Sequence, residues 1–222
     1  MPLKRLIIGL LALILIPVES FGKSWTFIPG GSYARKSGQQ SKYWNAGFSV
    51  GITPFLLISE SWMAGLRLSY SRWTPDGYRM MDLAPPIRMK AIYTVRVDGI
   101  DSLDYYNLYL FDSKSGGTTV LEIVPSVRFK ALRDAGETMV LSGQAGAGLF
   151  MIRSDARAVG KYGPNVAEIR LDEVSEVKPG IQLGISLAVR KQLEFMPLWT
   201  YVFTEANRRS YFLMNLGFLF EL

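Results

Sequence analysis

The sequence contains no cysteine and no histidine, and these two absences exclude several kinds of chemistry. Without cysteine the chain has no disulfide, no thiolate ligand for a metal and no lipid-modified N-terminal cysteine. Without histidine it has no Ser-His catalytic pair, no histidine-ligated zinc and no imidazole general base. The chain also shows no phosphate-binding loop and no cofactor motif. We therefore predict that the protein is not an enzyme and that it binds no metal and no cofactor.

Long apolar runs are also scarce, and the one clear run lies at the N-terminus. Lys4 and Arg5 precede the apolar stretch 6–18, and Ser20-Phe21-Gly22 follows it in a small-x-small pattern. This stretch is shorter than the roughly 20 residues that a spanning helix needs. We interpret 1–22 as a cleaved signal peptide, with a single membrane anchor as the alternative. Because no later apolar run is long enough for a spanning helix, residues 23–222 can enter a membrane only as a closed barrel.

The formal net charge is +6, from 25 lysines and arginines against 19 acidic residues. No run of basic residues resembles a nucleic-acid patch, so we predict no nucleic-acid partner. A positive surplus is compatible with anionic partners such as lipid head groups.

Alternation of apolar and polar residues is the dominant pattern of the chain. In the last twelve residues every second position is apolar, which is typical of a β-strand with one apolar face. This alternation runs to the C-terminus of the given sequence, and we predict that the strand closes a sheet. Its apolar positions are Phe212, Met214, Leu216, Phe218, Phe220 and Leu222. Eight segments have strand character: 24–35, 44–53, 61–73, 118–132, 139–153, 179–190, 193–203 and 211–222.

The connections between these segments alternate in length. The second, fourth and sixth are short, whereas both long connections, 74–117 and 154–178, are odd-numbered. An up-and-down barrel with this parity has its long loops on one rim and its tight turns on the other, as outer-membrane barrels do. The sequence therefore predicts an all-β, antiparallel transmembrane barrel of eight strands in one domain, 23–222.

The two faces of the strands have different predicted roles. If the apolar face contacts lipid, the polar face fills the lumen, where charges must pair because isolated buried charges are unstable. The predicted lumen cluster is Arg67, Glu122, Arg128, Lys130, Arg190, Glu194 and Glu221. The predicted aromatic girdle at the membrane borders is Trp44, Trp62, Tyr70, Trp199 and Tyr201. In the alternative arrangement, a secreted lipocalin-like barrel, the apolar face points inward and binds a small apolar ligand.

The longest connection, 74–117, has internal structure of its own. Residues 88–97 alternate, Asp98-Gly99 is a turn signal, and an aromatic run follows. We predict a β-hairpin that projects from the rim, with two further membrane strands, ten in all, as the alternative. Aromatic residues and arginine are favoured in binding sites, so candidate ligand contacts are Arg88, Lys90, Tyr93, Arg96, Tyr105 and Tyr106. The 154–178 connection is polar, and we expect it to be a mobile loop.

The chain resembles the OmpA/OmpX-like group of small outer-membrane β-barrels of Gram-negative bacteria. The segments that carry this resemblance are the leader, the strand 65–73, the glycine-rich segment 143–150 and the last three strands. The resemblance implies insertion by the barrel-assembly machinery with periplasmic chaperones, in contact with outer-membrane lipid and lipopolysaccharide. It also implies a terminal strand that usually ends in Phe, whereas this chain ends in Leu222. We expect a non-enzymatic barrel with a structural role or with an external ligand bound by its long loops. A narrow solute channel is the alternative.

Overall fold

A computed structural model describes residues 25–37, 39–84, 87–88, 105–106, 109–134, 136, 138–190, 192–204 and 209–221. The predicted signal peptide and Leu222 therefore lie outside the described residues. Among the residues described, no helix is long and apolar enough to cross a bilayer.

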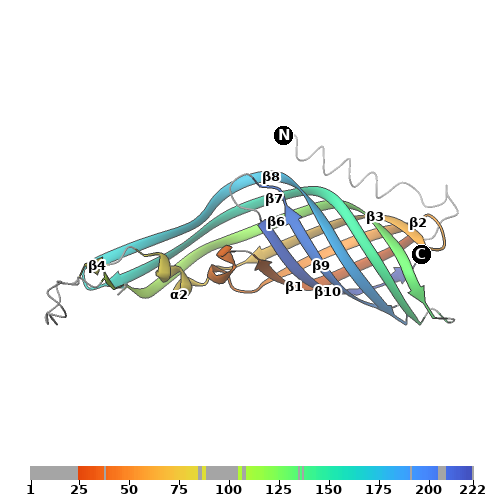
Figure 1. The fold of residues 1–222 in the computed structure, drawn as a ribbon, viewed down its shortest axis with the longest axis horizontal. Helices are drawn as coiled ribbons and strands as arrows, with labels where there is room; N and C mark the ends of the chain where they lie inside the picture. Colours follow the sequence, from red (N-terminus) through yellow and green to blue (C-terminus); the bar gives the residue numbers. More distant parts are fainter. Residues whose placement is uncertain are drawn as a thin grey trace, which may run out of the picture.

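The described chain is built almost entirely from antiparallel strands (Figure 1). The strands are β1 (Trp25–Ser37), β2 (Gly47–Leu57), β3 (Trp62–Trp73), β4 (Ile87–Arg88), β5 (Tyr105–Tyr106), β6 (Leu110–Arg133), β7 (Met139–Tyr162), β8 (Asn165–Val189), β9 (Leu193–Val202), β10 (Arg209–Phe218) and β11 (Phe220–Glu221). Three short helices occur in the connections: η2 (Gln39–Tyr43), α2 (Gly77–Met80) and η3 (Met81–Leu83).

One sheet closes on itself. Its order is β10-β9-β8-β7-β6-β3-β2-β1, and β10 also pairs with β1 from Gly30↔Gly217 to Ser37↔Ser210. β11 continues the line of β10 along β1 after an interruption at Leu219. The prediction of an eight-stranded up-and-down barrel closed by the C-terminal strand is confirmed. Among the described residues the ring has no further strands of the ten-strand alternative, because β4 and β5 pair only with each other in a separate sheet.

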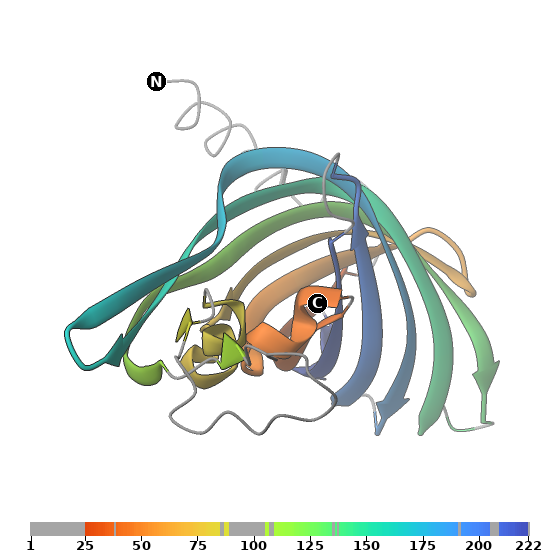
Figure 2. The same cartoon turned by 60° about the vertical axis from the view of Figure 1, so that its left-hand side comes forward.

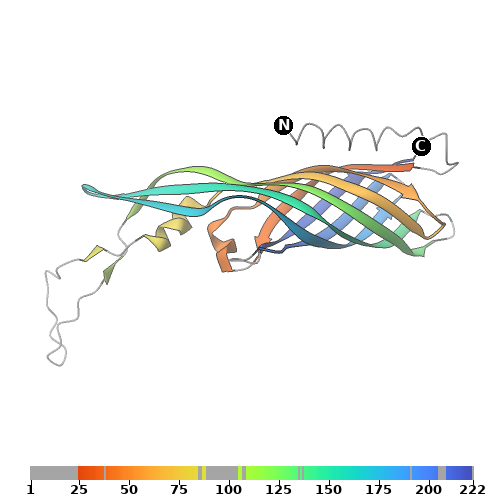
Figure 3. The same cartoon turned by 90° about the horizontal axis from the view of Figure 1, so that it is seen from above.

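Short and long connections alternate along the chain, so each kind lies at one end of the barrel. The end that carries 58–61, 134–138 and 190–192 is named the tight-turn end, and the opposite end is named the long-loop end. Three strands extend far past the rim at the long-loop end (Figures 1 and 3). They have 24, 24 and 25 residues, about twice the 9–11 residues that a tilted strand needs to cross a membrane. We name the described parts of these strands beyond the rim, 110–117, 154–162 and 165–174, the extension.

The extension corrects the expectation that 154–178 is a mobile loop. β7 and β8 pair almost without interruption up to Tyr162↔Asn165, and Gly163 supplies the positive φ of 56° in the two-residue turn between them. Alternating small and aliphatic side chains face the concave side and are buried: Ala156, Ala158, Ala167, Ile169 and Leu171. The segment 74–84 with α2 and η3 lies on this concave side (Figure 2) and contacts β6 and β7. The extension is therefore a ribbon with one packed apolar face.

The close approach of β6 and β7 generates the first testable prediction. A Cβ built on Gly148 would lie 2.2 Å from the backbone oxygen of Ile123, whereas a Cβ on Gly143 would meet nothing within 4 Å. We expect Gly148→Ala to lower the free energy of unfolding by about 1–3 kcal/mol through overpacking. The matched Gly143→Ala variant should stay within about 0.5 kcal/mol of wild type. Urea unfolding in phospholipid vesicles measures both, and equal losses would contradict this β6–β7 packing.

The turn between β6 and β7 generates a pH-dependent prediction. The Asp134 carboxylate accepts hydrogen bonds from the Met139 backbone N–H at 2.9 Å and from the Thr138 hydroxyl. These bonds, that from Met139 first, hold the pKa of Asp134 below its usual value. Asp134 therefore stabilises the folded state fully above the ordinary aspartate pKa of about 4, and this contribution is lost as the pH falls through the lower, folded-state pKa. The difference in unfolding midpoint between wild type and Asp134→Asn should shrink over that window. A pH-independent difference would contradict the prediction.

Candidate functional site: the filled lumen and the outer face

The inside and the outside of the barrel have opposite chemistry. Large apolar side chains on the outward positions are exposed over the whole barrel, for example Phe48, Leu183 and Phe218 at 52%, 50% and 53%. Inward positions in the middle of the barrel carry polar side chains that are buried, such as Arg67, Gln182 and Glu194. This is the arrangement of a barrel in lipid, and it is the reverse of the lipocalin-like alternative. The protein is a transmembrane β-barrel.

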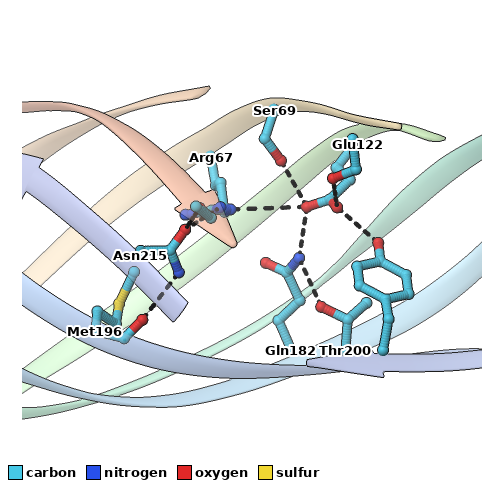
Figure 4. Close-up of polar contacts among 10 residues, drawn as sticks. Arg67, Ser69, Glu122, Gln182, Met196, Thr200 and Asn215 are labelled. Carbon is cyan, nitrogen blue, oxygen red and sulfur yellow. Dashed lines mark hydrogen bonds and ion pairs between the residues drawn. The ribbon is translucent and has the colours of Figure 1, made fainter. Parts of the chain in front are cut away.

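Glu122 is the centre of the first buried network (Figure 4). Its side chain is fully buried and accepts hydrogen bonds from Ser69 Oγ at 2.6 Å, Gln182 Nε2 at 2.7 Å and the Tyr211 hydroxyl at 2.6 Å. The Nε atom of Arg67 lies 3.7 Å from the same carboxylate. With β6, which carries Glu122 itself, four strands meet at this one carboxylate (β3, β6, β8 and β10), so the network ties opposite walls of the barrel together.

Arg67 extends this network toward the closing strand. Its Nη2 atom donates to Asn215 Oδ1 at 3.0 Å, and Asn215 Nδ2 donates to the Met196 carbonyl at 3.0 Å. The Ser32 hydroxyl from β1 also donates to Asn215 Oδ1. The seam between β1 and β10 is thereby joined to the network by side chains as well as by its backbone ladder.

Arg128 and Glu194 form a second buried network nearer the tight-turn end. The two contacts between guanidinium and carboxylate are 2.6 and 2.9 Å, and Arg128 Nη2 also donates to Gln144 Oε1 at 2.8 Å. The guanidinium lies 4.3 Å above the ring centroid of Phe55, a cation–π contact. A cavity of about 20 Å3 lies between the two networks, beside Arg67, Arg128 and Asn215. That volume holds roughly one water molecule, so the described side chains pack closely around the cavity at this level.

The lumen toward the long-loop end is apolar. Trp73, Phe150, Leu198 and Leu213 are fully buried in it, with Trp44 beside them. Lys36 is the cation of this layer: its Nζ atom lies 3.2 Å from the ring centroid of Trp44 and donates to Thr118 Oγ1 at 2.8 Å. Cation–π contact and a hydroxyl acceptor together stabilise a charge that is held among apolar side chains.

The predicted lumen cluster divides into two groups in the structure. Arg67, Glu122, Arg128 and Glu194 are buried and joined in the two networks. Lys130 is only half-buried near the tight-turn end, and Arg190 is exposed in the β8–β9 turn with φ of 53°. The side chain of Glu221 lies outside the described residues. The prediction is thus wrong for Arg190, because β8 ends at Val189 and Arg190 already belongs to the turn.

The predicted girdle is also divided. Trp62, Tyr70 and Trp199 are exposed on the outer face at 48%, 37% and 38%, and Tyr201 stacks obliquely beside Trp199 with centroids 5.7 Å apart. The girdle prediction is wrong for Trp44, which is 7% exposed and lies inside the barrel. β2 begins at Gly47, so Trp44 precedes the strand and does not follow its alternation. On the closing strand, Phe212, Met214, Leu216, Phe218 and Phe220 all lie exposed on the outer face.

The predicted ligand contacts lie beyond the rim where they are described. Arg88 pairs with Tyr105, and Ile87 pairs with Tyr106, as the base of a hairpin requires. Lys90, Tyr93 and Arg96 lie outside the described residues. The predicted lumen cluster did not include Gln144, Gln182 and Asn215. All three occupy the alternating polar positions of their strands, so the same alternation could have identified them. Lys36 had no such signal, because the first strand was expected to end at Arg35.

Comparison with known proteins gives no match to a family model and no match to a curated protein. Solved structures do match. Ail, the attachment invasion locus protein of Yersinia pestis, has 10% identity and a TM-score of 0.45, over 89% of this chain and 99% of that one. Neisserial surface protein A has 14% identity and a TM-score of 0.41, over 88% and 95%. The N-terminal β-barrel domain of Pseudomonas aeruginosa OprF has 8% identity and a TM-score of 0.38, over 89% and 97%. All three are outer-membrane barrels, and the likeness concerns the fold alone.

The Arg128–Glu194 pair generates a prediction about the lumen. Removing one partner leaves the other charge buried and unpaired, which destabilises proteins by about 3–5 kcal/mol. We expect Glu194→Gln and Arg128→Met each to lower the free energy of unfolding by about that amount. The double variant should be more stable than the sum of the two losses implies, because no unpaired charge remains. Urea unfolding in vesicles measures all four proteins, and additive losses would contradict the pairing.

Proposed function

We propose that the protein is a non-enzymatic outer-membrane barrel of a Gram-negative bacterium that binds an external polypeptide through its extension. The barrel is the anchor in this proposal, and outer-membrane lipid and lipopolysaccharide surround it. The barrel-assembly machinery and periplasmic chaperones act during insertion, with the apolar C-terminal strand as the element that they recognise.

The observation that carries the proposal is the free edge of β8. β8 pairs with β7 along almost its whole length, but its pairing with β9 begins only at Gly180. From Asn165 to Val177, β8 therefore has a strand neighbour on one side only among the described residues. Every second residue of such an edge presents unpaired backbone N–H and C=O groups, which accept an added strand from another chain.

The other edge of the extension is different. The first part of β6 lies beside the segment 74–84, where Lys114 Nζ donates to the Pro75 carbonyl at 2.8 Å. The rings of Tyr78 and Phe111 also contact each other, with centroids 4.6 Å apart. The β6 edge thus has side-chain contacts with 74–84, whereas the β8 edge has no second strand neighbour among the described residues, so we take the β8 edge as the side for strand addition.

Charged side chains on the outer face limit self-association of the open edge. Arg157 pairs with Asp155 at 3.0 Å, and Arg170 pairs with Glu168 at 2.9 Å and with Glu173 at 3.6 Å. Charges along an edge strand disfavour pairing with an identical edge. A partner with a matching charge pattern avoids that penalty, which favours a different polypeptide over a second copy of this chain. The predicted contacts in 88–111 remain a second candidate surface in the same long-loop region.

Two matched truncations test the proposal. In one variant Asn-Gly replaces 157–170, joining Ala156 to Leu171, which pair with each other. In the control Asn-Gly replaces 89–104, joining Arg88 to Tyr105, which also pair. The probe is fluorescent, reduced and carboxymethylated α-lactalbumin, an unfolded chain, mixed with detergent-solubilised protein. We expect wild type and the 89–104 variant to bind it, and the 157–170 variant, which keeps only 171–177 of the one-sided stretch, to bind it much more weakly.

Folding of each variant is checked by its heat-dependent migration on a gel after extraction from outer-membrane fractions. Equal binding by all three proteins, or no binding by wild type, would overturn strand addition at β8. Loss of binding only in the 89–104 variant would transfer the site to the hairpin. Recovery of wild type in the soluble fraction without detergent would overturn the proposed location.

A further inference from the structure

The upper limit of the apolar outer face is marked by arginine. Outward positions are apolar along β3 from Trp62 to Tyr70, along β6 up to Leu121 and along β7 up to Met151. The next outward residues toward the long-loop end are Arg72, Thr119 and Arg153. Arg72 and Arg153 are exposed, while both chain neighbours of each are buried in the lumen. These two side chains therefore point out of the barrel at the border of the lipid-facing band.

The register brings these residues into one line across three neighbouring strands. Arg72 pairs with Thr119, and Thr119 pairs with Arg153. Ser175 on β8 continues the line as the partner of Arg153. Neighbouring strands lie about 4.8 Å apart, so the Cα atoms of the two arginines are roughly 10 Å apart with a hydroxyl side chain between them. We name Arg72, Thr119 and Arg153 the arginine row.

The charge of the arginine row is not compensated by the residues around it. Neither guanidinium makes a salt bridge within the part of the chain that the structure describes. The nearest outward acid on β7, Asp155, already pairs with Arg157 at 3.0 Å, and Glu173 on β8 pairs with Arg170. Tyr70 lies two residues below Arg72, on the outer face at 37% exposure. Two unpaired cations thus sit directly above an apolar, aromatic-bordered band.

We propose that the arginine row binds the phosphate group of a lipid in the membrane leaflet at the long-loop end. A phosphorylated head group lies at the border between hydrocarbon and water, which is the depth of these side chains. Guanidinium groups bind phosphate oxygens with paired N–H donors. Two arginines roughly 10 Å apart at their Cα atoms can approach one phosphate from both sides, while the Thr119 hydroxyl lies beneath it. The inference goes beyond the proposed binding of a polypeptide. It concerns the outward face of β3, β6 and β7, whereas the polypeptide is proposed to bind the edge of β8.

The test measures lipid retention by native mass spectrometry. Wild type and variants are folded into phosphatidylcholine vesicles that contain either phosphorylated lipid A or the same lipid A after removal of its phosphates. They are then released in mild detergent. We expect wild type to retain phosphorylated lipid A and not the dephosphorylated form. Arg72→Gln and Arg153→Gln should each lower the retained fraction about tenfold, the usual effect of losing one charged hydrogen-bond donor. Arg72→Lys should restore part of it.

The matched control is Arg35, which is also exposed on the outer face one step beyond the apolar band of its own strand. Its partner on β10 is Phe212, so it has no arginine in its line. Arg35→Gln should leave retention near the wild-type level. Equal loss in Arg35→Gln would overturn the site in favour of general attraction at the border. Retention of both lipid A forms, or additive effects of Arg72→Gln and Arg153→Gln on binding free energy, would overturn a shared phosphate.

Discussion

Closure of the backbone ladder between β1 and β10 is the constraint on which the structure depends. Hydrocarbon offers no hydrogen bonds, so each backbone N–H and C=O group in the membrane needs a partner within the protein. The ladder from Gly30↔Gly217 to Ser37↔Ser210 supplies those partners at the seam. Once the ring is closed, alternate side chains have only two destinations, lipid or lumen. The exposed apolar outer face and the polar interior both follow from that division.

The lumen must then be filled without unpaired charge. Around Glu122, four neutral or cationic groups from three other strands satisfy one carboxylate, and Arg128 and Glu194 neutralise each other. Tyr211 joins the polar and apolar layers: its hydroxyl donates to Glu122, and its ring lies edge-on to Trp73 with centroids 5.1 Å apart. The result is a packed core that holds the walls together.

The alternation of residues was sufficient to predict the ring, its polarity and four members of the buried networks. It worked there because a strand between lipid and lumen has a strict period of two. It failed beyond the strand ends: Trp44 precedes β2 and Arg190 follows β8, so neither obeys the parity of the neighbouring strand. The extension was missed for another reason. Ala156, Ala158 and Ala167 are too small to signal a packed face, and the residues that bury them, such as Met80 and Met81, come from a different connection.

The extension accounts for the two separate binding surfaces that we propose for this one barrel. β6, β7 and β8 continue past the membrane border, so the same three strands pass from lipid to water within a few residues. At the border the outward side chains change from apolar to arginine, where lipid phosphates are the available anions. Beyond it water can satisfy the unpaired backbone of β8, so an open edge that hydrocarbon would forbid becomes tolerable. An edge at this height is held away from the leaflet by the three paired strands, and this position makes it accessible to a polypeptide outside the membrane.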